Sequence, residues 1–370
     1  MIYKQFQGKK ISALGLGAMR LPTVDGKNEC IDEEATAQMV EYAMQNGVNY
    51  FDTAWGYHMG NSELVMGRVL KKYPRESFYL ADKFPGYDLS NINKVEEIFE
   101  KQLEKCQVDY FDFYLFHNLC EMNVDEYLNP AYGILDYLLK QKANGRIRHL
   151  GFSAHGTIET MTKFLQAYGK YMEFCQLQIN WLDWSFQSAK EKVELVRSYN
   201  IPVWVMEPVR GGKLATVRFD GIMEGRNAPE TAFRFLQGID DVVVTLSGMS
   251  NFQQLSENIQ TFQTEKPLTK AEEDYLFALA EKMTGKTLPC TSCRYCTNKC
   301  PMELDIPYLL DLYNEDCFSN GGFMAPMALS KLPDEKKPSA CIACQACEAV
   351  CPQNIKISQA MADFTERMKR

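Results

Sequence analysis

The chain has 370 residues, of which 46% are hydrophobic and 24% charged, so it can form one large globular domain and one small one. Its net charge is −8 and it shows no basic run or stripe, which argues against nucleic acid as a partner. No apolar stretch is long enough to span a bilayer, and the first residues lack the apolar core of a signal peptide. We therefore expect no membrane association and a cytoplasmic location.

Short apolar runs alternate with helical periodicities from residue 10 to about residue 265, at a spacing of about 30 residues. Eight units of this kind suit a parallel sheet closed into a (β/α)₈ barrel. An open doubly wound sheet is the alternative, but Pro22 follows Gly15 and Gly17 where a dinucleotide-binding turn would open a helix. The expected strands are 11–19, 49–54, 77–84, 111–117, 147–154, 174–180, 202–208 and 241–249.

Polar side chains follow three neighbouring strands at the point where each ends. Asp52 and Tyr57 follow the second strand, Lys83 the third and His117 the fourth. Since the chemistry of a parallel barrel lies at the C-terminal ends of its strands, we expect these four to converge. Any one of them alone would be interpreted as an ion pair or hydrogen bond that anchors a loop.

These side-chain types suit the reduction of a carbonyl group. A tyrosine of ordinary pKa, about 10, is a poor acid, but a neighbouring lysine stabilises the phenolate and lowers that pKa. An aspartate fixes the lysine, and a histidine hydrogen-bonds the carbonyl oxygen. Together they predict protonation of that oxygen while hydride reaches the carbon.

The segments FDTAWGY, LADK and YLFHN resemble the Asp–Tyr–Lys–His tetrad of the aldo-keto reductases, and the resemblance covers residues 1 to about 280, including an opening hairpin followed by a strand. It implies that Tyr57 is the general acid, that Lys83 and Asp52 tune it, and that His117 orients the carbonyl. His58, His149 and His155 are interpreted as structural or surface residues, and Glu207 either lines the site or pairs with Arg210.

The same resemblance implies an NAD(P)H cofactor across the barrel mouth. The implied contacts are Ser153 and Gln178 at the carboxamide, Met206 at the nicotinamide, Arg210 and Gly211 (in 209–212) over the pyrophosphate, and Ser247, Gly248 and Asn258 near the adenine. Two positions depart from the family. Met206 replaces a frequent aromatic residue, and neutral Asn251, Gln253 and Gln254 stand where a basic residue often pairs with the 2′-phosphate, which disfavours NADPH.

Eight of the thirteen cysteines form two C-x₂-C-x₂-C-x₃-C-P runs, which are typical of bacterial ferredoxins that bind two [4Fe–4S] clusters. In such ferredoxins the fourth cysteine of each run serves the other cluster. One predicted ligand set is therefore Cys290, Cys293, Cys296 and Cys351, and the other is Cys341, Cys344, Cys347 and Cys300. Structural zinc is the disfavoured alternative, because it usually takes paired cysteines from separate places.

The cysteine-rich part is expected to be a small, mainly helical, ferredoxin-like domain. Forty residues lie between Cys300 and Cys341, and Ile306, Leu309, Leu310 and Tyr313 form one helical stripe. A further helix is expected at 269–283, before Gly285. We therefore assign residues 1–284 to the barrel and 285–370 to the ferredoxin-type domain, and leave Cys317 unassigned.

The leading hypothesis is an oxidoreductase that acts on a small carbonyl or alcohol and passes single electrons through its clusters. Its partners would be that substrate and a redox protein such as a ferredoxin or flavodoxin. Hydride carries two electrons whereas a cluster usually passes one, and a flavin could join them, although no flavin motif is present. In the alternatives the clusters are structural or redox-sensing, or the barrel is a non-catalytic scaffold for electron transfer.

Overall fold

The computed structural model describes residues 1–285, 287–288, 290, 296–319, 321–322, 324–351 and 353–369. The chain divides into two compact units, Met1–Phe277 and Ala278–Arg370, which are described separately. Helix α11 (Lys270–Thr284) runs through this division, close to the helix expected at 269–283. Among the described residues, no helix combines the length and the hydropathy that a bilayer crossing requires.

The first unit is built on a closed barrel of eight parallel strands, which confirms the (β/α)₈ prediction over the open sheet. The strand order is β10-β3-β4-β5-β6-β7-β8-β9, and β10 closes the barrel against β3 with Thr245 opposite Leu14. The strands are β3 (Leu14–Gly17), β4 (Tyr50–Asp52), β5 (Tyr79–Phe84), β6 (Phe111–Leu119), β7 (Ile147–Ala154), β8 (Phe174–Gln178), β9 (Val203–Met206) and β10 (Val242–Ser247).

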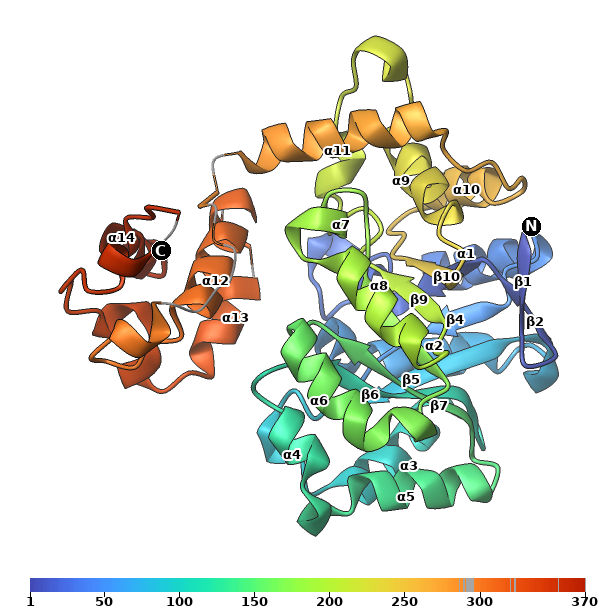
Figure 1. Ribbon diagram of the computed structural model, residues 1–370. Helices are drawn as coiled ribbons and strands as arrows, with labels where there is room; N and C mark the ends of the chain where they lie inside the picture. The colour runs from blue at the N-terminus through green and yellow to red at the C-terminus, as the bar shows by residue number, and fades with distance from the viewer. Residues whose placement is uncertain are drawn as a thin grey trace. The chain divides into compact units, whose positions relative to one another are not determined.

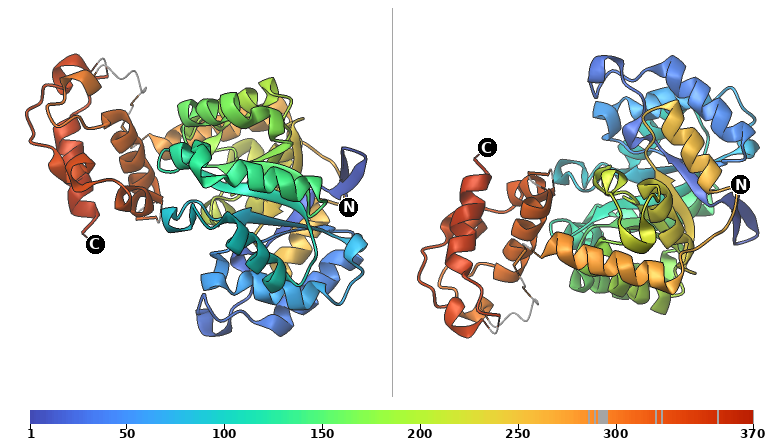
Figure 2. Two further views of the ribbon diagram at one scale, coloured as in Figure 1. Left: turned by 90° about the horizontal axis from the view of Figure 1, so that it is seen from below. Right: turned by 90° about the horizontal axis from the view of Figure 1, so that it is seen from above.

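Helices surround these strands (Figures 1 and 2). Side-chain caps start several of them, as where Asp32 accepts a hydrogen bond from the Ala35 amide at 2.9 Å. The helices of this unit that precede α11 are α1 (Glu33–Gln45), α2 (Ser62–Leu70), α3 (Val95–Cys106), α4 (Val124–Leu128), α5 (Ile134–Ala143), α6 (Ile158–Tyr168), α7 (Asp183–Phe186), α8 (Ala189–Ser198), α9 (Ala228–Gln237) and α10 (Phe252–Thr261).

An antiparallel hairpin, β1 (Tyr3–Phe6) and β2 (Lys9–Ser12), plugs the end of the barrel at which the strands begin. Phe6 contacts Phe113 and Trp204 edge-on or tilted inside the barrel, with ring centroids 5.8 and 5.1 Å away. The strand expected at 11–19 was wrong as one element, because Ser12 pairs in the hairpin whereas Leu14 pairs in the barrel. With this end filled, the opposite end carries the candidate site.

The second unit contains helices and 3₁₀ turns but no strand among its described residues, as expected of the helical ferredoxin type. Its α-helices after α11 are α12 (Ile306–Ser319), α13 (Met324–Ser330) and α14 (Ile357–Arg367). The described parts of the two cysteine runs correspond: a 3₁₀ turn follows Cys296 and another follows Cys347, and positive φ angles recur at Glu303 and Asn354.

A core between the helices of this unit holds the two runs together. Leu309 and Leu310 of α12 and Met361 and Phe364 of α14 are buried in it, as the predicted helical stripe requires. Cys296 and Cys347 belong to the same core, and the described cysteines at the other ends of the runs pack against it. Both cysteine runs are thus anchored on one apolar interior.

Candidate active site and candidate cluster sites

Four side chains of the predicted tetrad converge where β4, β5 and β6 end. Lys83 Nζ lies 2.6 Å from Asp52 Oδ1 and donates to the Thr53 carbonyl oxygen at 2.8 Å. Lys83 Nζ also donates to the Tyr57 hydroxyl oxygen at 3.4 Å. Tyr57 lies on a 3₁₀ turn (Tyr57–Gly60) that follows β4. The His117 ring stands edge-on to the Tyr57 ring with centroids 6.1 Å apart.

The Lys83–Asp52 ion pair is almost completely buried, with 1% of Lys83 and 3% of Asp52 exposed. Burial of the ammonium favours its neutral form, but the charge of Asp52 and its hydrogen bond outweigh burial and raise the pKa of Lys83 above its usual value. Burial also raises the pKa of Asp52, against the opposing influence of Lys83. A fixed cation therefore stands next to the tyrosine hydroxyl.

The pKa of Tyr57 differs from the expectation drawn from the sequence. Lys83 lowers it, as predicted, but burial of the phenol is the larger influence and the net pKa is raised. The prediction of a lowered pKa was therefore wrong for the protein without substrate, because desolvation of a phenolate costs more than one ammonium returns. Tyr57 remains a protonated hydroxyl that can donate a proton.

His117 is held as a neutral imidazole. Burial, with Lys83 and His155 adding to it, holds the pKa of His117 well below its ordinary value. The Tyr87 ring stands edge-on to it with centroids 5.0 Å apart, and Nδ1 is buried without a hydrogen-bond partner among the described residues. A neutral imidazole in this position can hydrogen-bond a carbonyl oxygen without adding charge.

A cavity with about 1130 Å³ of empty space opens beside the tetrad, and Asp52 and Tyr57 form part of its wall. Five of the residues expected at the cofactor also line it: Met206, Gly211, Ser247, Gly248 and Asn258. Asn258 Nδ2 donates to Ser247 Oγ at 3.1 Å, which joins α10 to the end of β10. The barrel thus brings together segments that are up to about 240 residues apart in sequence, from Gly17 to Asn258.

The other three residues expected at the cofactor do not line this cavity. Ser153 Oγ accepts a hydrogen bond from the Asn118 amide at 2.8 Å. Gln178 Nε2 donates to Asp183 at 2.8 Å, and Arg210 Nε donates to both Asp183 oxygens at 3.0 Å. Gln178 and Arg210 thus supply the hydrogen bonds that the fully buried Asp183 carboxylate requires.

Two histidines interpreted as structural are embedded in the fold. His58 accepts from the Leu21 amide at 3.1 Å, and His149 lies 2.6 Å from Glu173. His155, by contrast, lies next to His117 and hydrogen-bonds Gln178, which the sequence pattern did not indicate. Burial lowers the pKa of His155 to about 4, so it too is a neutral ring at this end of the barrel.

The sequence pattern also missed two charged residues of the cavity wall. Arg20 lies just after β3, at the same end of the barrel as Asp52, and that position is the signal that could have identified it. It is the one cationic side chain among the described residues that line the cavity. Glu257 of α10 lines the wall near Gln254 and accepts a hydrogen bond from Gln253 at 2.8 Å.

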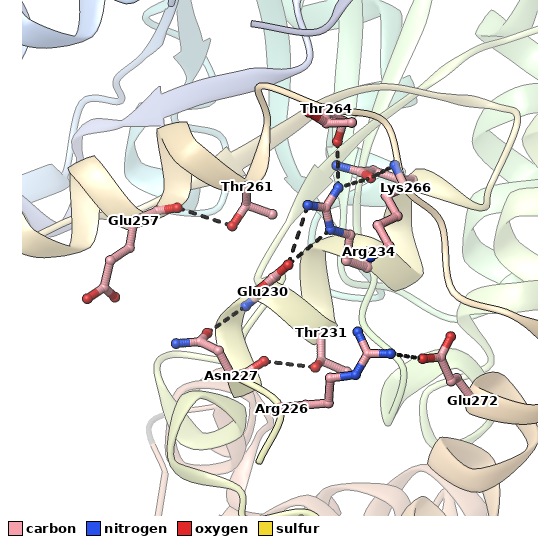
Figure 3. A network of polar contacts seen from close by, with 11 residues as sticks. Arg226, Asn227, Glu230, Thr231, Arg234, Glu257, Thr261, Thr264, Lys266 and Glu272 are labelled. Carbon is pink, nitrogen blue, oxygen red and sulfur yellow. Dashed lines mark hydrogen bonds and ion pairs between the residues drawn. The ribbon is translucent and has the colours of Figure 1, made fainter. Parts of the chain in front are cut away.

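A polar network holds the elements that border the cavity on this side (Figure 3). Asn227 caps α9 by accepting from the Glu230 amide at 2.9 Å, and Arg226 pairs with Glu272 of α11. Arg234 donates to the Thr264 carbonyl oxygen at 2.5 Å. The helix α9 that carries the lining residues Pro229 and Phe233 is thereby fixed at both ends.

The start of α10, where a bare helix terminus would offer free amides to a phosphate, is already capped. Asn251 Oδ1 accepts from the Gln254 amide at 2.9 Å, and Gln254 Oε1 accepts from the Ser250 amide at 2.8 Å. These side chains fill the positions that a phosphate oxygen would take at a bare helix terminus.

In the second unit, four cysteines line one cavity with about 350 Å³ of empty space: Cys300, Cys341, Cys344 and Cys347. Burial, with Cys341 and Cys300 adding to it, raises the pKa of Cys347 to about 11, as expected of neighbouring sulfur atoms. The Leu304 amide donates to Cys300 Sγ at 3.4 Å. The fourth cysteine of the first run therefore lies with the three of the second.

For the other predicted set, Cys290, Cys296 and Cys351 all belong to or pack against the core of the second unit, and Cys293 lies outside the described residues. Within the described part of the chain, no three side chains of His, Cys, Asp or Glu converge tightly enough to bind one metal ion.

Comparison with known proteins agrees with both parts of this description. Residues 13–231 match the aldo/keto reductase family, and residues 289–355 match the 4Fe–4S dicluster domain. Among curated proteins, the NADH-specific methylglyoxal reductase of Escherichia coli is 26% identical over 60% of this chain and 72% of its own length. Probable aldo-keto reductase 1 of Glycine max is 26% identical over 56% of this chain, which spans only 58% of that protein.

Solved structures share the barrel. Aldo-keto reductase AKR11C1 from Bacillus halodurans superposes with a TM-score of 0.60 at 24% identity, over 75% of this chain and 96% of its own. An aldo/keto reductase from Klebsiella pneumoniae, solved with NADP and acetate, has a TM-score of 0.59 at 19% identity, over 74% of this chain and 93% of its own. This chain belongs to the aldo/keto reductase family of oxidoreductases and carries a 4Fe–4S dicluster domain after its barrel.

Proposed function

We propose that the barrel reduces a small carbonyl compound to an alcohol, or runs the reverse oxidation, with Tyr57 as the proton donor. The observation that carries this proposal is the buried Lys83, whose ammonium lies 2.6 Å from Asp52 and 3.4 Å from the Tyr57 hydroxyl oxygen. Tyr57 and Asp52 face the cavity of about 1130 Å³, so a substrate oxygen can reach the hydroxyl. The Escherichia coli relative is a methylglyoxal reductase, and small carbonyl compounds of this class are our proposed substrates.

When bound, a nicotinamide would supply a hydride, which is a proton with two electrons, to the carbonyl carbon. Tyr57 gives its hydroxyl proton to the carbonyl oxygen, and Lys83 stabilises the phenolate that remains. Asp52 holds Lys83 charged and in place. Neutral His117 donates a hydrogen bond to the same oxygen and so orients the carbonyl.

The cavity fits a nicotinamide dinucleotide in part, and the proposed form is NADH. Met206, Ser247, Gly248 and Asn258 line the wall where the resemblance implies contacts. Near the α10 end the wall carries the carboxylate of Glu257 and neutral Gln254. A carboxylate can accept hydrogen bonds from ribose hydroxyls but repels a 2′-phosphate.

The second unit is proposed to hold two [4Fe–4S] clusters that exchange single electrons with a redox partner protein. Cys300, Cys341, Cys344 and Cys347 would hold one cluster, and Cys290, Cys293, Cys296 and Cys351 the other. The shared cavity of the first of these sets is what supports the crossing of Cys300. Each cluster, when bound, accepts or gives one electron at a time.

The test is anaerobic purification with iron and sulfide assay, followed by NADH oxidation with methylglyoxal and with larger aldehydes. We expect about eight iron atoms per chain and a turnover that Tyr57→Phe removes. Zinc in place of iron would contradict the cluster assignment, and a Tyr57→Phe variant of unchanged rate would contradict the barrel mechanism. If NADH bleaches the clusters, carbonyl reduction and electron transfer are coupled. If Cys341→Ala keeps the full rate of carbonyl reduction and NADH leaves the clusters oxidised, the clusters are structural or redox-sensing.

A further inference from the structure

Glu207 is a carboxylate of the cavity wall that the tetrad does not use. It follows β9 directly and lines the cavity together with Tyr57, Met206 and Gly211. Its backbone is held at a φ of +56°, in the left-handed region, although it is not glycine. The Glu207 carbonyl oxygen accepts from the Arg210 amide and from Asn180 Nδ2, both at 3.0 Å, and these bonds fix the strained backbone.

The Glu207 carboxylate points into the loop 209–212. A side-chain carbon added at Gly211 would lie 3.7 Å from Glu207 Oε2, and the Gly211 amide is near enough to oppose the rise in the pKa of this carboxyl. Arg210, Gly211 and Gly212 all have positive φ angles, and the amides of Arg210 and Gly212 donate within the turn to the carbonyl oxygens of Glu207 and Val209. The anion beside the Gly211 amide is thus the protein's own carboxylate.

The charge of the cavity also opposes a dinucleotide. Asp52 is neutralised by Lys83, but Glu207 and Glu257 leave two carboxylates against the single guanidinium of Arg20. A pyrophosphate brings two more negative charges, and like charges at close range in a desolvated cavity disfavour each other. The loop that the resemblance places over the pyrophosphate therefore already has a competing anion beside it.

We propose that Glu207 is an internal competitor for the pyrophosphate of the nucleotide, which binds only when this carboxylate is neutralised by a proton or turned out of the loop. The inference rests on the nucleotide use proposed above and adds that binding of the nucleotide takes up a proton. It makes Glu207 a residue that sets nucleotide affinity rather than one that takes part in proton transfer to the substrate.

The surroundings of Glu207 agree with such a role. Burial raises the pKa of Glu207, and Asp183 adds to the rise, whereas Arg20, the Gly211 amide and Arg210 oppose it. The charge of Glu207 also raises the pKa of Tyr57. A carboxyl group with a raised pKa is protonated more readily when a further anion approaches it.

The experiment measures nucleotide binding and does not depend on turnover. NADH, ADP and adenosine are titrated into the intact protein between about pH 5.5 and about pH 8.5 by calorimetry, in buffers of different ionisation enthalpy. For the unchanged protein we expect the Kd for NADH and ADP to rise with pH, by up to about tenfold per unit, with about one proton taken up on binding. Adenosine lacks the pyrophosphate and should show no such slope.

Two variants test the assignment to this residue. Glu207→Gln keeps the shape and should bind NADH more tightly at high pH with no pH slope, and Glu207→Asn, which tolerates a positive φ, should do the same if Glu207→Gln folds poorly. Glu257→Gln removes a charge from the same wall without changing the loop 209–212. The Kd of this variant for NADH should therefore still rise with pH.

Two results would overturn the inference, and they differ in what they leave standing. Equal, pH-independent NADH binding by the unchanged protein and Glu207→Gln would overturn the role of Glu207 alone. No binding of NADH or ADP by any variant at any pH would overturn it together with the proposed nucleotide, while the tetrad geometry would stand.

Discussion

The two candidate sites of this chain are assembled in opposite ways. The barrel site takes Asp52, Lys83 and His117 from three strands and Tyr57 from the turn after the first of them, and its cavity wall reaches from Gly17 to Asn258. The cysteine sites come from two short runs, each carrying its donors within twelve residues, and the described 3₁₀ turns of the two runs correspond. The first kind of site depends on a buried ion pair held by the whole barrel, whereas the second depends on local turns and on one exchanged ligand. Disruption of each should therefore have a different signature.

The largest expected effect is on the barrel chemistry. Tyr57→Phe removes the hydroxyl that donates the proton but keeps the ring against Lys83 and His117, so we expect kcat for carbonyl reduction to fall by about 10²- to 10⁴-fold. Steady-state kinetics with NADH and methylglyoxal measure it. Tyr73→Phe, which lies outside the cavity wall, is the matched control and should keep the rate. A fall of less than tenfold would assign proton donation to another group.

The second effect is on the stability of the barrel. Lys83→Met leaves the buried Asp52 carboxylate without its partner, and we expect the free energy of unfolding to fall by about 3–5 kcal/mol. All four tryptophans lie in the barrel unit, so urea unfolding followed by their fluorescence reports on that unit (they are Trp55, Trp181, Trp184 and Trp204). The double variant Asp52→Asn with Lys83→Met should recover part of the loss. A double variant no more stable than Lys83→Met would mean that the charge of Asp52 is not the cause.

The third effect separates the two cysteine runs. If Cys300 serves the far cluster, Cys300→Ala should lower the iron content from about eight to about four atoms per chain. The spectrum of the remaining cluster should then match that of the Cys344→Ala variant. If it serves its own run, the remaining spectrum should match Cys290→Ala instead. Electron paramagnetic resonance of the reduced proteins distinguishes the two, and Cys317→Ala, in α12 outside both runs, is the control that should retain all of the iron.

The smallest effect is a pH dependence that should be absent. The raised pKa of Tyr57 keeps its proton in place at neutral and moderately alkaline pH, and the lowered pKa of His117 keeps that ring neutral. At saturating NADH, kcat/KM for the carbonyl should therefore stay level from about pH 6 to about pH 9 and fall only above this range. A fall in rate as the pH drops from about 7 to about 6 would show that His117 gains a proton, contrary to its environment.

How much could be predicted from the sequence differs between the two sites for a physical reason. Strand ends in a parallel barrel all face one way, so the pattern sufficed to place Asp52, Lys83 and His117 at one end of three neighbouring strands. The pattern did not indicate that Arg20 and Glu257 line the cavity or that Arg210 forms an ion pair with Asp183. These features depend on how loops fold over the barrel mouth. The same holds for the net pKa of Tyr57, since burial is a property of the packed structure.

By itself, the sequence determined the alternation of strands and helices, the tetrad motifs and the two cysteine runs, because periodicity and ligand spacing are local. Only the tertiary structure decided that residues 11–12 leave the predicted strand for a hairpin, that Arg210 pairs with Asp183, and that the Glu207 carboxylate lies beside Gly211. Each of these depends on which partner a backbone or side-chain group finds when water is excluded, and that choice is made among groups far apart in the chain.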